Sequence, residues 1–150
     1  MKAIINLDKV KYPDVVTAKN GSDVLENGAF VALGGLVEDR LGRDWYQIGK
    51  LAAGCKLGFV ADVALMYDEA KDERDFELAA KAITRVYRPK AGQGITIAKK
   101  HGNGSVSKGT KLEIKADSYQ LQAHSSGVAV AEVLEVYNFE GQDSYYIEFI

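Results

Sequence analysis

Residues 26–35 read ENGAFVALGG and place a short apolar run between two turns. The run Ala29–Leu33 is apolar on both faces, so we expect a strand that is covered on both sides. Asn27–Gly28 before the run and Gly34–Gly35 after it favour turns, and a second Asn–Gly pair stands at 20–21. A five-residue strand between close turns is typical of a β protein assembled from short strands.

Similar segments recur along the chain. Residues 45–51 alternate in the two-residue rhythm of a half-buried strand. Other strand-like segments are 14–19, 58–67, 83–88, 94–99, 111–115, 119–122, 127–139 and 143–150. We therefore predict a mainly β fold, a small β-barrel or sandwich built from hairpins. A chain of 150 residues buries enough surface for a core of its own, so we expect a single domain over 1–150.

One segment departs from this pattern. Residues 68–84 are rich in Ala, Glu, Lys and Asp, and Phe76, Ala79, Ala80 and Ile83 recur at helical spacing. We predict one short helix or helical arm around residues 70–83, whose polar first half could equally be a loop. The arm would be a solvated surface or an extension that reaches a neighbouring subunit. The domain would then comprise an N-terminal β portion 1–67, a polar arm 68–84 and a C-terminal β-barrel portion 85–150.

Composition argues against several classes of protein. Nineteen Lys and Arg against 21 Asp and Glu give a net charge of −2, with basic residues scattered along the chain, so we expect no nucleic-acid partner. No apolar run approaches the roughly 20 residues that span a bilayer, and the first residues lack a signal-peptide core, so we expect no membrane partner and no export signal. One cysteine and two histidines predict neither a disulfide nor a metal site, and no cofactor motif stands out.

No motif indicates a catalytic site, and we expect the protein not to be an enzyme. Gly92–Gly94 and Gly102–Gly104 lead into further strands and fit hairpin turns better than phosphate-binding loops. The acidic pairs Glu38–Asp39 and Glu140 with Asp143 lie in polar turns, where solvated carboxylates are expected.

The remaining reactive side chains also have simpler roles. Cys55, next to a lysine, fits a packing residue better than a nucleophile, because no base accompanies it in the sequence. His101 and His124 stand in turn-like, polar surroundings, so we expect both to face solvent.

Aromatic residues provide the candidate interface. In the adjacent pairs Trp45/Tyr46 and Tyr145/Tyr146, one member must face outward from a strand. Tyr, Trp and Arg concentrate binding energy in protein contacts. The residues that combine such a side chain with a strand edge or an arm junction are Trp45, Tyr46, Tyr67, Arg85, Tyr87 and Arg88.

Three runs of the sequence resemble small structural proteins of tailed bacteriophages: residues 25–36, 63–69 and 85–92. Residues 106–114 and 127–134 are similar to the β-barrel half of phage head decoration proteins, also called capsid cement proteins. The resemblance lies in the order of turns and strands, and no individual residue carries over. It implies a subunit that binds the outside of the assembled capsid and holds the shell against the pressure of packaged DNA.

We accordingly expect a virion structural protein on the capsid exterior, made in the host cytoplasm. Its partners would be the major capsid protein and neighbouring copies of itself, as a homo-oligomer on the capsid whose many weak contacts act together. One alternative is a phage tail, baseplate or host-adhesion module that binds a protein or a glycan. A second is a small hydrolase or isomerase that uses dispersed carboxylates, which would require two converging acids with perturbed pKa values.

Overall fold

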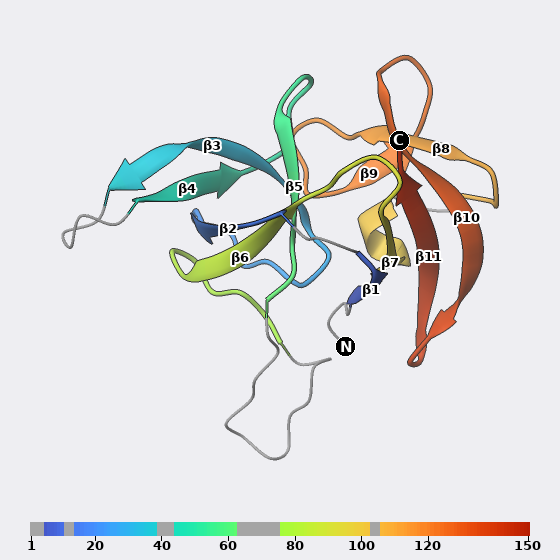
Figure 1. The fold of residues 1–150 in the computed structure, drawn as a ribbon, viewed down its shortest axis with the longest axis horizontal. Coiled ribbons are helices and arrows are strands. Elements are labelled where there is room, and N and C mark those ends of the chain that lie inside the picture. The colour runs from blue at the N-terminus through green and yellow to red at the C-terminus, as the bar shows by residue number, and fades with distance from the viewer. Residues whose placement is uncertain (1–4, 11–13, 39–43, 63–75, 103–105) are drawn as a thin grey trace.

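The computed structural model describes residues 5–10, 14–38, 44–62, 76–102 and 106–150, and these form eleven strands and one short 3-10 helix (Figure 1). The strands make two units, a closed five-stranded barrel and a six-stranded sheet. The predicted mainly β fold with a barrel is confirmed.

The barrel uses strands from the first 88 residues. They are β2 (Asp14–Lys19), β3 (Phe30–Glu38), β4 (Asp44–Gly49), β5 (Lys56–Val60) and β6 (Ile83–Arg88), and they close in the order β2-β4-β3-β5-β6. Every pair is antiparallel except β2 and β4, which run parallel. The barrel predicted for residues 85–150 is therefore misplaced, because β6 pairs back to β2 and β5.

The remaining strands form the sheet. They are β1 (Ile5–Lys9), β7 (Gly94–Ala98), β8 (Lys111–Ile114), β9 (Leu121–Ala123), β10 (Ala129–Phe139) and β11 (Gln142–Phe149), in the order β1-β7-β11-β10-β8-β9. The N-terminal strand β1 thus joins a sheet whose other strands all lie between Gly94 and Phe149. The 3-10 helix η2 (Lys99–Gly102) follows β7, where the sequence predicted a hairpin turn at Gly102.

The turn at Glu26–Gly28 is fixed to the end of β5. The Asn27 side chain donates to the Asp62 carbonyl at 3.1 Å and accepts from the Asp62 amide at 2.9 Å. Gly28 has φ +88°, which glycine adopts readily, and its amide donates to the Val60 carbonyl at 2.8 Å. The chain consequently enters β3 at a defined point beside β5.

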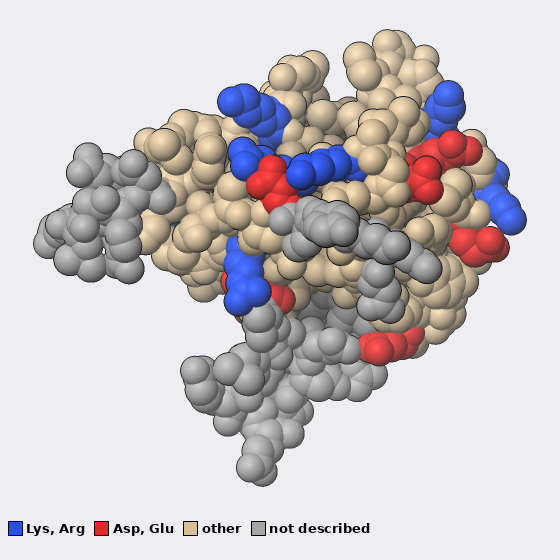
Figure 2. Space-filling model, in the orientation of Figure 1, with Lys and Arg blue, Asp and Glu red and all other residues tan. Residues whose placement is uncertain are grey.

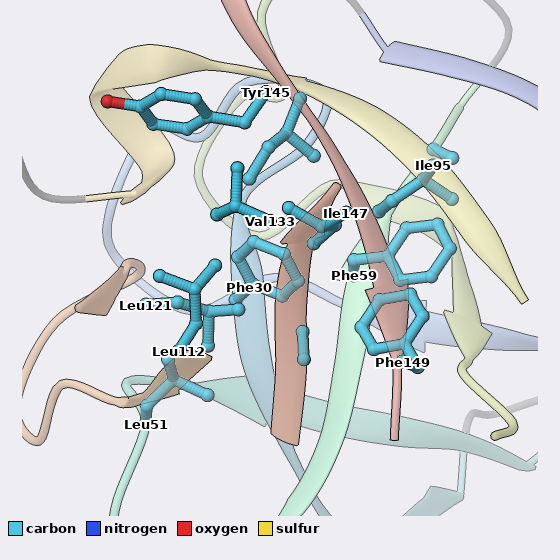
Figure 3. Close-up of a cluster of buried hydrophobic side chains, with 13 residues drawn as sticks. Phe30, Leu51, Phe59, Ile95, Leu112, Leu121, Val133, Tyr145, Ile147 and Phe149 are labelled. Carbon is cyan, nitrogen blue, oxygen red and sulfur yellow. The ribbon is translucent and has the colours of Figure 1, made fainter. Parts of the chain in front are cut away.

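Two hydrophobic clusters form the core of the protein. One cluster fills the barrel and includes Val31, Ile48 and Val86. The other lies between the outer face of the barrel and the inner face of the sheet, where Phe59 stacks on Phe149 with ring centroids 5.8 Å apart (Figure 3). The strand Ala29–Leu33 is buried on both faces, as predicted, since its alternate residues contribute to both clusters.

The helix predicted around residues 70–83 is not formed in the part that the structure describes. Leu78 is buried and makes a β-bridge with Leu25, each amide donating to the carbonyl of the other at 2.7–3.0 Å. A turn follows, in which Lys81 has φ 61°. Tertiary pairing therefore overrides the local helical propensity here. Residues 70–75 lie outside the described residues.

Candidate docking surface

The β3–β4 hairpin extends beyond the barrel wall, to the left in Figure 1. Strand β5 pairs with β3 only over Phe30–Leu33, and β2 pairs with β4 only at Tyr46 and Gln47. Beyond those points the described residues of the two strands pair only with each other, Val37 with Trp45 and Glu38 with Asp44, and Leu36 pairs with Tyr46 at the base. A two-stranded ribbon has both faces open to solvent or to a partner.

The projecting ribbon exposes apolar side chains. Leu36 is 58% exposed and Val37 is 36% exposed, although both lie within a strand. Trp45 is half-buried and lies directly opposite Val37. We call Leu36, Val37 and Trp45 the hairpin patch; Val37 and Trp45 share one face of the ribbon, and Leu36, opposite Tyr46, lies on the other face. The predicted end of this strand at Gly34–Gly35 is wrong, because β3 continues through both glycines to Glu38.

The base of the ribbon is held by Tyr46 and Arg88. Tyr46 packs against the cluster inside the barrel, so Trp45 is the member of the pair that faces outward, as predicted. The Arg88 guanidinium carbon lies 6.0 Å from the centroid of the Tyr46 ring, within the range of a cation–π contact. Nη2 of Arg88 donates to Oδ1 of Asp14 at 2.8 Å, and this hydrogen bond lowers the pKa of Asp14 and raises that of Arg88.

The other predicted interface residues are not gathered here. Tyr87 is half-buried against the cluster between barrel and sheet, where it stacks on Phe59 at 5.4 Å, so its role is in packing. Arg85 is exposed on the outer face of β6, opposite Thr17 of β2. Tyr67 lies outside the described residues. The hairpin patch thus retains one of the six predicted residues at its surface and a second and third, Tyr46 and Arg88, at its base.

Aliphatic residues were missed by the sequence reasoning. Leu36, Val37 and, on the outside of the barrel, Val15 and Ile83 are each at least 36% exposed. The alternation within β2 and β6 could have identified Val15 and Ile83, because Val15 precedes the half-buried Val16 and Ile83 precedes the buried Thr84. Leu36 and Val37 follow two glycines and carried no such signal.

One of the two histidines differs from expectation. His101 is buried, not solvent-facing, and burial lowers its pKa from 6.5 to about 4. Its ring packs against Gly28, where an added Cβ would lie 3.2 Å from Cδ2. His124 is partly exposed, and its Nδ1 lies 3.1 Å from Oε2 of Glu113. His101 therefore belongs to the packing of loops, whereas His124 is exposed beside Glu113.

A cavity of about 400 Å³ lies between the barrel and the β8–β9 connection, near His101. Its charged side chains are paired: Nζ of Lys100 lies 2.5 Å from Glu26, and Nζ of Lys50 lies 3.9 Å from Asp117. Tyr119 donates to Asp23 at 2.6 Å, and burial, followed by this bond, raises the pKa of Tyr119. These contacts stabilise the connection and bring no nucleophile beside a base.

Other candidate reactive groups lie apart. Glu140 is exposed in the turn between β10 and β11, Asp143 is exposed near the start of β11, and Cys55 is a free, half-buried thiol that packs against the larger cluster. Glu38 and Asp39 have no described side chains. Within the described ranges, no three His, Cys, Asp or Glu side chains are grouped as metal ligands, and no helix is long and apolar enough to cross a bilayer.

Charge is evenly mixed on the face shown in Figure 2, where Lys and Arg side chains alternate with Asp and Glu.

No protein-family model, no curated protein and no solved structure matches this chain.

Proposed function

We propose that this protein is a virion structural protein of a tailed bacteriophage that binds the outside of the assembled capsid and stabilises it. The observation that carries the proposal is the projecting β3–β4 ribbon, which holds Leu36, Val37 and Trp45 away from the barrel. Apolar side chains on such a ribbon are buried when it lies against a neighbouring protein.

The anchoring of the ribbon supports this role. Arg88 ties the ribbon to β2 through Asp14, and Tyr46 ties it to the barrel interior. A ribbon with a fixed base loses less conformational entropy on binding than a free loop would. On a capsid, many identical contacts of this kind act together, so each contact need bury only a small area.

The proposed partners are the major capsid protein and neighbouring copies of this protein, on the exterior of the virion. Such a role requires a surface that binds other proteins and does not require a catalytic site. The charged side chains of the 400 Å³ cavity pair with one another, which is consistent with this role. The alternative of a tail, baseplate or adhesion module would use the same ribbon on a different partner, and the experiment below separates the two.

The test is co-sedimentation of the purified protein with expanded and unexpanded capsid shells of the source phage. We expect saturable binding at a fixed ratio to capsid subunits, and shells that then survive harsher heating. Leu36→Ser and Val37→Ser together should weaken attachment by about tenfold or more, the effect of losing a buried anchor. The matched control is Val24→Ser, because Val24 is 57% exposed outside the ribbon.

Equal binding of the ribbon variant and wild type would remove the hairpin patch from the interface. Absence of binding to either shell would overturn the capsid proposal in favour of the tail or adhesion module. Trp45→Ala provides a separate check, since it should weaken attachment while the barrel stays folded.

A further inference from the structure

The loop between β9 and β10, residues 124–128, is tied to a buried carboxylate. Glu113 on β8 is 4% exposed, and Oε2 accepts from the Gly127 amide at 2.7 Å and from the Ser125 amide at 3.3 Å. Nδ1 of His124 lies 3.1 Å from Oε2, and Nε2 of Gln122 donates to Oε1 at 3.0 Å. Burial opposes ionisation of Glu113, but these bonds outweigh it and lower its pKa to about 2. The loop is therefore held in one conformation by an ionised group.

This fixed loop presents an apolar side chain. Val128 is 84% exposed, more than any other large hydrophobic residue in the described part of the chain. An exposed valine on a mobile loop would need no explanation, since single exposed apolar residues are common. Here the Glu113 carboxylate contacts four residues and thereby fixes the loop that ends at Val128. Val128 is therefore preorganised for contact, because the loop loses little conformational entropy on binding.

A groove of about 320 Å³ lies beside Val128. Its walls come from four segments: Leu57 of β5, residues 89–91 after β6, residues 128–130 at the start of β10, and residues 149–150 at the end of β11. The apolar residues that line it are Leu57, Pro89, Ala91, Val128, Ala129, Val130, Phe149 and Ile150. Ile150 is 59% exposed, so apolar surface continues from the groove to its rim.

One charged side chain lines this groove. Lys90 is exposed and lies in the turn after Pro89, and every other lining residue is apolar. Within the described residues, Lys90 forms no ion pair within 4.0 Å, and its charge contributes to lowering the pKa of Asp14, whose carboxylate binds Arg88. A ligand that fills the groove with an apolar group and places a carboxylate at the rim would satisfy both features.

We propose that the groove and Val128 form a docking surface for a segment of a partner protein in which an apolar side chain stands next to a carboxylate. The surface is separate from the hairpin patch, which projects from the other side of the barrel (Figure 1), and its occupation does not require a capsid. The protein therefore has two distinct contact surfaces and can connect two partners.

The test uses small probes that carry the expected chemistry. Titration of the methyl-labelled protein with 1-naphthylacetate, followed by NMR, should shift the methyl signals of Leu57, Val128, Val130 and Ile150. The cationic analogue 1-naphthylmethylammonium should bind about threefold or more weakly, the effect of one half-exposed ion pair with Lys90. Lys90→Gln should remove this preference and leave binding of the neutral analogue 1-naphthaleneethanol unchanged.

The variant that tests the valine is Val128→Ser, which should weaken binding of 1-naphthylacetate by about fivefold or more through lost apolar contact. Val24→Ser is the control, because it removes another exposed valine, 57% exposed, outside the groove. Shifts confined to other methyl groups, or equal affinity for the anion and the cation, would overturn the proposal. Concentration-dependent shifts of these methyl groups without any probe would identify a second copy as the occupant and would also overturn it. None of these readouts depends on capsid binding.

Discussion

Gly127 lies directly over the carboxylate of Glu113: its amide donates to Oε2 at 2.7 Å, and a Cβ added at Gly127 would lie 2.8 Å from the same oxygen. The carboxylate cannot move aside freely, because Ser125 and Gln122 also bind it. Close approach of the backbone to a fixed side chain thus requires glycine at this position.

Gly127→Ala should therefore destabilise the protein by about 1–3 kcal/mol, the range for disturbing a buried hydrogen-bonded group. Urea unfolding measures the change. Gly35→Ala is the matched control, since an added Cβ there meets no atom within 4 Å, and its effect should stay within about 0.5 kcal/mol. Equal stability of the two variants would show that the carboxylate yields without cost.

Glu113 should also make the protein sensitive to acid. Its folded-state pKa is about 2, below the ordinary 4.5, so its contribution to stability is complete above pH 4.5 and is lost as the pH falls from 4.5 toward 2. Glu113→Gln should unfold more readily than wild type at pH 6 and show a flatter profile below pH 4.5. Urea midpoints at pH 6, 4 and 3 test this, and parallel profiles for the two proteins would contradict it.

His101 acts in a different pH range. The buried ring is neutral in the folded state, with a pKa of about 4 against 6.5, so the protein loses stability as the pH falls from 6.5 toward 4. Between pH 7 and pH 5 this loss amounts to about 2 kcal/mol, since one pKa unit corresponds to about 1.4 kcal/mol.

His101→Gln, which cannot take up a proton, should lack this loss. The measurement is the difference in free energy of unfolding between pH 7 and pH 5 for the variant and for wild type. His124→Gln is a useful comparison, because His124 directly follows β9 and its side chain is 37% exposed. The same pH dependence in wild type and His101→Gln would assign the loss to other groups.

Much of the fold could be predicted from local patterns. The buried segment Ala29–Leu33 contains no polar residue, so both its faces had to be covered. The identity of the strands that close the barrel could not be predicted, because β6 meets β2 across more than 60 residues of sequence. Such pairing depends on topology, which short-range patterns do not encode.

The candidate surface was predicted only in part, for a similar reason. Trp45 has an outward position that follows from its neighbour Tyr46, whereas the packing of Tyr87 against Phe59 depends on the sheet that arrives from the other end of the chain. His101 shows the same limit: its sequence neighbours are polar, but its spatial neighbour is Gly28. Residues whose environment is built by distant segments cannot be classified from adjacent ones.

Phe59 should be a main link between the barrel and the sheet. It is fully buried, stacks on Tyr87 of the barrel and Phe149 of the sheet, and lies 6.4 Å from the Phe30 ring (Figure 3). Phe59→Ala should cost about 3–5 kcal/mol of stability, as for other buried aromatic truncations, in thermal or urea unfolding.

Tyr87→Ala, which removes one layer of this stack, should cost less, about 1–3 kcal/mol, because the ring is only half-buried. Its attachment to capsid shells should equal that of wild type, since the ring packs inward. Arg85→Ala on the same strand is the control and should change stability by less than about 0.5 kcal/mol. If Tyr87→Ala is as stable as wild type but no longer attaches to capsid shells, Tyr87 belongs to the interface and does not join the two units.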